Sequence, residues 1–166
     1  MSKDLIPELS YEKIAAFDSA TLSTLSDALE NRGFFTVTNH GINDNLLDDS
    51  YDLAKKFFNL DSSIKATYSR PEHGGARGYT PFGKETALGE KVPDLKEFWH
   101  HGPKIDHTYD DRIKGNISVK EIDKFSPHFD TLFTSLNNVG MGVLSAIAEV
   151  LNLEKDFFNN WVIKGN

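Results

Sequence analysis

The feature that most constrains the fold is a long run of apolar residues at helical spacing towards the end of the chain. Between Phe129 and Leu151, apolar side chains recur at steps of three and four residues, which places them on one face of an α-helix. Ser126 is a suitable N-cap, and Pro127 suits the first helical position. Such a helix, about 25 residues at 1.5 Å rise, is roughly twice the average length. We therefore expect a scaffold helix on which other elements pack.

Two glycines interrupt this run. Gly140 and Gly142 each cost helix propensity, because glycine loses more backbone freedom than any other residue when a helix forms. A close contact between the helix backbone and another element would compensate for that cost. We expect such a contact at these positions.

Helical and strand-like patterns also occur in the first third of the chain. Residues 18–32 carry leucines at helical spacing, with Asp18 or Ser19 as N-cap and Gly33 just past the end. Aromatic and β-branched residues follow at 34–38, which indicates a strand. Residues 44–58 again alternate an apolar and a charged face, which predicts a second amphipathic helix.

The rest of the chain gives weaker signals. A polar, glycine-rich stretch after residue 69 reads as a long loop that holds two short strands, near residues 79–82 and 95–100. A last short helix is expected at 154–162. The whole pattern predicts an α+β fold, helix-rich, with a few short strands and one long scaffold helix.

Composition excludes several classes of function. The 18 basic residues are scattered singly among 25 acidic ones, and the net charge of -7 argues against nucleic-acid binding. With no cysteine, the chain cannot form disulfides, zinc–thiolate sites or a cysteine nucleophile. The first residues lack the apolar core of a signal peptide, and no run approaches 18 apolar residues. We expect a cytoplasmic protein without a membrane partner.

The stretch "SPHFD" contains His128-x-Asp130, a pair that non-haem iron enzymes use as two of three metal ligands. With six histidines and 25 acidic residues, about one such pair is expected by chance. Residues two apart point about 200° apart around a helix, so they cannot reach one ion. We therefore interpret Asp130 as a carboxylate that complements the helix dipole, and not as a metal ligand.

Residues 78–84, "GYTPFGK", match the letters of a phosphate-binding loop. Glu85 stands where that loop needs Ser or Thr, the interior is bulky, and Pro81 removes one N–H donor. An exposed strand with turns is the preferred interpretation.

Histidines and carboxylates also gather in "FWHHGPKIDHTYDD", which holds potential metal ligands at His100, His101, Asp106, His107, Asp110 and Asp111. Adjacent histidines on a strand face opposite ways, so at most one of the first two could join His107. A solvated loop after a strand is the simpler alternative.

Three further residues have open interpretations. His40 lies in a turn, where a ring bonded to a neighbouring backbone group is commoner than a catalytic histidine. Arg77 and Tyr79 could bind an anionic substrate through a guanidinium fork and a phenol. They could equally be ordinary surface residues.

Several segments together carry a resemblance to a known family. "GFFTVTNHGI" at 33–42 resembles the N-terminal region of the iron(II)- and 2-oxoglutarate-dependent dioxygenases of the isopenicillin N synthase type. "LIPELS" looks like the family's opening strand, and "AKKFFNLDSSIKATY" looks like its helix and following turn. "RGYTPFGKE" and "PDLKEFWHHGP" look like its paired strands, and the helix from "SPHFD" looks like its scaffold helix. The resemblance covers roughly residues 4–166.

This resemblance implies that residues 1–166 form one N-terminal domain, which normally packs on a double-stranded β-helix, or jelly-roll, core. The family's iron ligands, its 2-oxoglutarate-binding Arg-x-Ser and most of its substrate contacts belong to that core, which is expected after residue 166 and is missing here. The resemblance therefore assigns no catalytic, cofactor-binding or metal-ligating residue to this chain. By family analogy, Arg77, Tyr79 and Phe82 are expected to form a substrate-lining edge.

The function implied for the intact protein is an oxidoreductase that uses Fe(II) and 2-oxoglutarate to hydroxylate, desaturate or cyclise a small molecule. This chain alone is expected to bind neither cofactor and to be inactive, and the uncovered face could support self-association. The alternative is a non-catalytic interaction or dimerisation module that keeps the scaffold without the core.

Overall fold

The structure is a computed structural model that describes residues 6–105 and 114–162. The chain divides into two compact units, one of residues 1–42 and 135–164 and one of residues 43–134. The long helix α5 (Phe125–Val150) contributes its first ten residues to the second unit and the remainder to the first.

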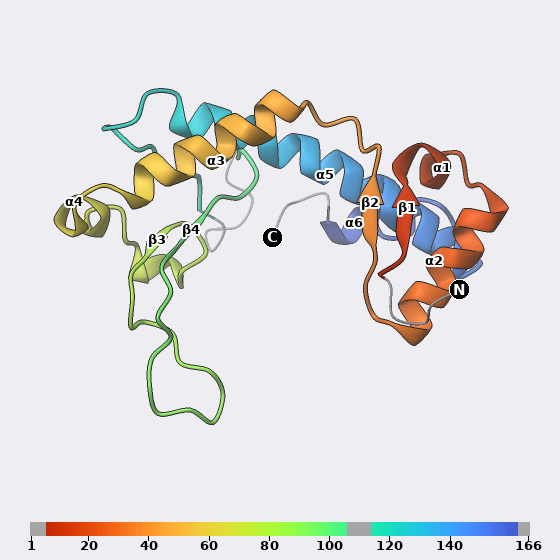
Figure 1. The fold of residues 1–166 in the computed structure, drawn as a ribbon, viewed down its shortest axis with the longest axis horizontal. Helices are drawn as coiled ribbons and strands as arrows, with labels where there is room; N and C mark the ends of the chain where they lie inside the picture. The colour runs from red at the N-terminus through yellow and green to blue at the C-terminus, as the bar shows by residue number, and fades with distance from the viewer. Residues whose placement is uncertain (1–5, 106–113, 163–166) are drawn as a thin grey trace. The chain divides into compact units, whose positions relative to one another are not determined.

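The first unit contains a two-stranded parallel sheet. β1 (Glu8–Ser10) pairs with β2 (Thr36–Thr38), with Leu9 opposite Val37. Parallel strands need a crossover connection, and α1 (Tyr11–Ala15) and α2 (Ser19–Asn31) provide it. The strands lie side by side in Figure 1. The structure thus confirms the strands expected in "LIPELS" and at 34–38, the second being shorter than the sequence suggested.

Helix α2 begins and ends as its sequence predicts. The Asp18 carboxylate accepts a hydrogen bond from the Thr21 backbone N–H, which satisfies a free donor of the first turn. Gly33 has φ of +83° and donates its N–H to the Ala28 carbonyl, as expected for a residue that ends a helix in the left-handed region.

The core of the first unit is aliphatic. Leu9, Ile14, Leu25 and Ala146 are buried together, so β1, α1, α2 and α5 meet at one cluster. Gly142 of α5 permits a close approach here, because a Cβ at that position would overlap the Tyr11 side chain at its hydroxyl. A Cβ at Gly140 would meet nothing within 4 Å. The expected close contact is therefore confirmed at Gly142 and wrong at Gly140.

The second unit begins with α3 (Asp44–Phe58), which has the predicted bounds. The Asn43 side chain accepts from the Asn45 N–H at its start. Two short helices follow, α4 (Ser62–Ala66) and the 3₁₀ turn η1 (Pro71–His73).

The two strands expected in the glycine-rich stretch form a hairpin. β3 (Gly78–Thr80) pairs antiparallel with β4 (Phe98–His100), with Tyr79 opposite Trp99. The expectation of an exposed strand is wrong, because Gly78 and Tyr79 are buried. Gly78 has no room for a side chain, since a Cβ would lie 2.5 Å from the Tyr68 carbonyl oxygen.

The core of the second unit is aromatic, with the fully buried Phe57 at its centre. The Phe57 ring lies 4.8 Å from Trp99 and 5.6 Å from Phe125, measured between centroids. Tyr68 and Tyr79 pack on it edge-on. Aromatic pairs in such arrangements contribute about 0.5–1.5 kcal/mol each beyond the area they bury, so α3, the hairpin and α5 are held by one cluster.

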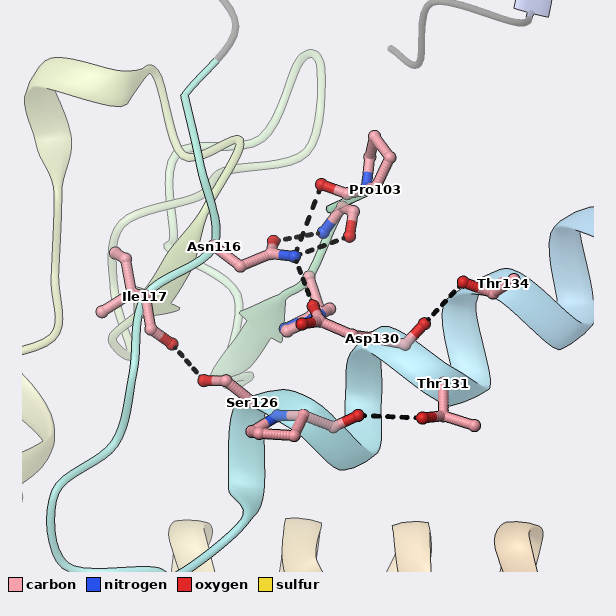
Figure 2. A network of polar contacts seen from close by, with 10 residues as sticks. Pro103, Asn116, Ile117, Ser126, Asp130, Thr131 and Thr134 are labelled. Atoms are coloured by element: carbon pink, nitrogen blue, oxygen red, sulfur yellow. Dashed lines mark hydrogen bonds and ion pairs between the residues drawn. The ribbon is translucent and has the colours of Figure 1, made fainter. Parts of the chain in front are cut away.

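The last two helices begin at other residues than the sequence predicts. Helix α5 begins at Phe125, so Ser126 lies inside it, and the Ser126 hydroxyl donates to the Ile117 carbonyl instead of capping the helix (Figure 2). The final helix, α6, covers only Asn159–Val162. Residues 154–158 form no part of it, so the predicted start at Glu154 is wrong.

The class expected from the sequence is confirmed: a helix-rich α+β fold with a few short strands and one long helix. Within residues 6–105 and 114–162, the strands form two separate two-stranded sheets and no closed barrel.

Candidate functional site

The three residues predicted to line substrate do not share one environment. Arg77 and Tyr79 are buried, with 8% and 5% of their surface exposed, whereas Phe82, just beyond β3, is 55% exposed. Tyr79 takes part in the aromatic cluster of the second unit. These positions make Phe82 the accessible member of the predicted edge, and their role with substrate stays a prediction.

Tyr79 also belongs to a buried polar group. Its hydroxyl donates to Glu97 Oε2 at 2.5 Å, and Lys65 Nζ lies 2.8 Å from the same oxygen. Burial opposes ionisation of Glu97, but the hydrogen bonds from Lys65 and Tyr79 and the positive charge of Lys65 outweigh it, so the pKa of Glu97 is lowered. Burial, and then the bond to Glu97, raises the pKa of Tyr79 to about 12. Tyr79 is therefore a donor to a carboxylate at neutral pH.

A second polar network joins the segment after β4 to the first turns of α5 (Figure 2). His101 Nε2 lies 2.8 Å from Asp130 Oδ1. Asn116 Nδ2 donates to the same oxygen at 2.9 Å and to the Gly102 carbonyl at 2.8 Å. Asn116 Oδ1 accepts from the Gly102 N–H at 2.8 Å. We call His101, Gly102, Asn116 and Asp130 the clasp.

The hydrogen bond to Asp130 determines which ring nitrogen of neutral His101 carries the proton. Burial lowers the pKa of His101; the hydrogen bond and charge of Asp130 oppose this effect, and the Arg77 charge adds to it. An ionised carboxylate only accepts, so the neutral imidazole carries its proton on Nε2. Nδ1 is then an unprotonated acceptor, and it has no hydrogen-bond partner within the described part of the chain.

Arg77 packs directly on the clasp. A Cβ on Gly102 would overlap Arg77 Cζ and Nη2, so the guanidinium occupies the space that any side chain at this position would need. Arg77 Nη1 also donates to the Ala76 carbonyl at 2.6 Å. The absence of a side chain at Gly102 thus leaves the space that the buried guanidinium occupies.

The pair His128 and Asp130 does not form a metal site. His128 Nε2 lies 2.9 Å from the Ser50 hydroxyl and 3.1 Å from the Leu46 carbonyl, both on α3. Asp130 instead accepts from the clasp. The two side chains therefore have separate partners, and the interpretation of Asp130 as merely complementing the helix dipole is incomplete.

The remaining motifs are settled in part. His40 Nδ1 accepts from the Ile42 backbone N–H at 3.2 Å, which confirms the turn interpretation. His100 is exposed, whereas His101 belongs to the clasp, so a solvated loop is wrong for His101. Asp106, His107, Asp110 and Asp111 lie outside the described residues. Within the described residues, no group of three His, Asp or Glu could hold a metal ion.

A small hollow adjoins the residues of the phosphate-loop match. Its volume is about 240 Å³, and Tyr79, Thr80, Pro81, Lys84 and Arg70 are among its lining residues. Arg70 is engaged through Nη1 by the Thr67 and Ser69 carbonyls. Of the three residues predicted to line substrate, only Tyr79 lines this hollow.

No sequence signal marks the residues that organise these networks. Lys65 and Glu97 are 32 positions apart, and Asn116 and Asp130 are 14 apart. No local sequence motif indicates that residues so far apart along the chain form a contact. Burial of Glu97 could be suspected only from its position directly before the β4 residues Phe98 and Trp99.

The family is shown by comparison with known proteins. Residues 6–120 match the family described as non-haem dioxygenase in morphine synthesis, N-terminal. The chain belongs to this family of dioxygenase N-terminal regions, and the resemblance inferred from the sequence is confirmed.

Curated relatives and solved structures agree with this assignment. The 2-oxoglutarate-dependent dioxygenase frbA of Dothideomycetidae sp. (strain 11243) is 28% identical, over 91% of this chain and 49% of that protein. Homoarginine-6-hydroxylase 2-ODD-233 of Oryza sativa subsp. japonica is 30% identical, over 81% and 42%. The chain spans about half the length of the curated relatives it matches.

A 2OG-Fe(II) oxygenase family protein from Caulobacter crescentus is 36% identical with a TM-score of 0.80, over 93% of this chain and 51% of that one. A full-length Neurospora crassa protein, solved in complex with alpha-KG, has the same TM-score at 22% identity, over 99% and 53%. The latter likeness concerns the fold alone.

The described residues do not fit an iron site of the kind these relatives' names imply. Such a site needs two histidines and a carboxylate with open positions. His128 and Asp130 have the partners given above, and no other group of three potential ligands occurs in the described ranges.

Proposed function

We propose that this chain is the N-terminal region of an Fe(II)- and 2-oxoglutarate-dependent oxygenase that oxidises a small molecule by hydroxylation, desaturation or cyclisation. The observation that carries the proposal is the family match over residues 6–120. The 36% identity to an oxygenase family protein of about twice the aligned length supports it. In this proposal the chain supplies scaffold and substrate-side surface, and the iron and 2-oxoglutarate sites lie in the part of the relatives that it does not cover.

The chain's own contribution is to hold the β3–β4 hairpin in place. The Lys65–Glu97–Tyr79 group fastens the two strands to α4, and the clasp fastens the segment after β4 to α5. Both networks are largely buried, so the hairpin is positioned before any substrate arrives, which reduces the entropy cost of binding.

The decisive test extends the chain to the full length of its native reading frame and measures succinate release with Fe(II) and 2-oxoglutarate over a panel of small molecules. We expect succinate release from the extended protein and none from residues 1–166 alone. Absence of 2-oxoglutarate turnover across the panel by a folded extended protein would count against the proposal, as would turnover by the short chain.

The substrate edge is part of the same proposal. Phe82 is the exposed member of this edge, whereas Arg77 and Tyr79 are buried. In the extended enzyme, Phe82→Ala should raise KM more than it lowers kcat, because an apolar contact made equally to substrate and transition state contributes uniform binding. Tyr51→Ala, at another exposed aromatic residue, on α3, is the matched control.

The remaining expectations are also proposals. A cytoplasmic location without nucleic-acid partners is supported by the net charge of -7 and the scattered basic residues. Helix α5 is long and apolar enough to cross a membrane by length and composition alone. Its Phe125 and Ala146 lie in the two hydrophobic clusters. Recovery of the protein in the soluble cell fraction would test this assignment.

Self-association of the isolated chain is supported by exposed apolar residues of the first unit, Leu136, Leu151 and Trp161 among them. Sedimentation velocity at several concentrations would test it. No comparison favours the alternative of a non-catalytic module.

A further inference from the structure

A larger hollow lies within the second unit, between α3, β4 and the start of α5. Its volume is about 450 Å³, within the range of roughly 300–1,000 Å³ for pockets that take small organic ligands. Six of its nine lining residues are aromatic: Phe57, Phe58, Phe98, Trp99, Phe125 and Phe129. It shares no lining residue with the hollow beside β3.

The aromatic lining is held rigidly. Phe57 and Phe125 are almost fully buried, so they support the other rings and offer little surface themselves. Trp99 lies 5.2 Å from Phe125, and Phe129 lies 4.7 Å from it, both between ring centroids. Phe58, Phe98 and Phe129 are half-buried, so they can meet a ligand. The rings are therefore positioned before a ligand binds.

Glu97 and His101 are the other polar residues of the lining, and the Trp99 indole N–H is a buried donor without a hydrogen-bond partner in the described part of the chain. The Glu97 carboxylate accepts from Lys65 and Tyr79 and, being ionised, can donate nothing. Neutral His101 donates its Nε2–H to Asp130, so its Nδ1 is unprotonated, and this buried atom has no hydrogen-bond partner in the described part of the chain. No lysine or arginine is among the described residues that line the hollow.

We propose that this hollow binds a small organic cation, an amine or quaternary ammonium ion on an apolar body. The negative faces of aromatic rings attract such cations, and an aromatic enclosure is the usual way to recognise a quaternary ammonium group. Lys65 already balances the charge of Glu97, so the rings provide most of the attraction.

The test uses the 166-residue chain and two probes of nearly equal shape, choline and its neutral isostere 3,3-dimethyl-1-butanol. The chain has two tryptophans, Trp99 in the hollow and Trp161 in the other unit, so their indole N–H resonances separate binding here from effects elsewhere. Trp161→Phe assigns the two signals. At constant ionic strength, choline should shift the Trp99 resonance saturably, and the neutral alcohol should bind at least about fivefold more weakly.

A matched pair of variants tests whether the ligand binds in this hollow. Ala54 of α3 lines the hollow and is half-buried, and Ala54→Leu should fill it and weaken choline binding at least about tenfold. Ala66→Leu, the same change at an exposed position of the same unit, should leave binding unchanged. Circular dichroism and thermal unfolding confirm that both variants fold.

Three results would overturn the proposal: equal affinity for the neutral alcohol, parallel shifts of both tryptophans, or full binding by folded Ala54→Leu. The assay needs neither iron nor 2-oxoglutarate. Its failure is therefore distinct from a failure of succinate release by the extended protein.

Discussion

Lys65 of α4 and Glu97 beside β4 form an ion pair that is almost entirely withdrawn from water. Their side chains are 7% and 15% exposed, and Lys65 Nζ lies 2.8 Å from Glu97 Oε2. Lys65 also donates to the Phe58 carbonyl at 2.9 Å. The pair thus connects α3, α4 and the hairpin through one ammonium group.

Replacing one partner of this pair should be costly. Lys65→Met leaves the Glu97 carboxylate buried without its cation, and loss of one partner from a buried pair typically costs about 3–5 kcal/mol of unfolding free energy. The double variant Lys65→Met/Glu97→Leu should be more stable than Lys65→Met, because no lone charge remains. Urea unfolding followed by circular dichroism measures both.

The exposed pair Lys55–Asp52 is the control for that experiment. Its atoms are 3.8 Å apart and its side chains are 74% and 67% exposed. Solvent-exposed pairs contribute little, so Lys55→Met should scarcely move the urea midpoint. A loss of unfolding free energy in Lys55→Met as large as the loss in Lys65→Met would contradict the view that burial makes the Lys65–Glu97 pair important.

Stability should decrease in mild acid because of His101. Burial lowers the pKa of His101 in the folded chain, Asp130 opposes this, and Arg77 adds to it. The unfolded chain therefore takes up the proton first, near the unperturbed pKa of about 6.5. The unfolding free energy should fall as the pH drops below that value, down to the folded-state pKa.

The variant His101→Gln should lack this component of the pH dependence, whereas His100→Gln, at the exposed neighbour, should keep it. Urea midpoints measured at several values between about pH 5 and 8, the range in which histidine titrates, provide the comparison. An unchanged slope in His101→Gln would show that another group titrates.

Asn116 is expected to be essential to the clasp because it donates and accepts at once. Asn116→Asp cannot donate to the Gly102 carbonyl or to Asp130, and it places a second negative charge beside Asp130. Unsatisfied buried groups cost about 1–3 kcal/mol each, so we expect a loss of at least that size in urea unfolding. Asn137→Asp, on the exposed part of α5, should be close to neutral.

The two glycines of α5 should respond oppositely to alanine. Gly140→Ala adds a side chain where nothing lies within 4 Å and should stabilise the chain by about 0.5–1 kcal/mol through helix propensity. Gly142→Ala would push the Tyr11 ring aside and break its hydroxyl's bond to the Asn138 carbonyl at 3.3 Å. Thermal unfolding of both variants should place Gly142→Ala below Gly140→Ala, and the reverse order would contradict the contact.

Local patterns predict the helices well. The bounds of α3 follow from the Asn43 cap and an unbroken amphipathic period, both of which lie within one segment. Ser126 looks like the cap of α5, yet the helix already begins at Phe125, and the Ser126 hydroxyl bonds to Ile117 in the preceding loop. Whether a serine hydroxyl caps its own helix or bonds to a neighbouring loop depends on tertiary structure, which local sequence does not reveal.

Long-range features escape prediction for the same reason. The burial of Tyr79 depends on Phe57 and Glu97, 22 and 18 positions away along the sequence. The role of Asp130 depends on His101 and Asn116. The family resemblance supplies what local periodicity cannot, namely that the strands pair and the long helix serves as scaffold.

The bonds between Asn116 and the Gly102 backbone join two points of the chain 14 residues apart. One amide side chain therefore satisfies both backbone polar groups of Gly102, directly after β4 ends at His100. The course of the backbone beyond the hairpin is thus set by a side chain of a distant residue, and not by a continued strand ladder.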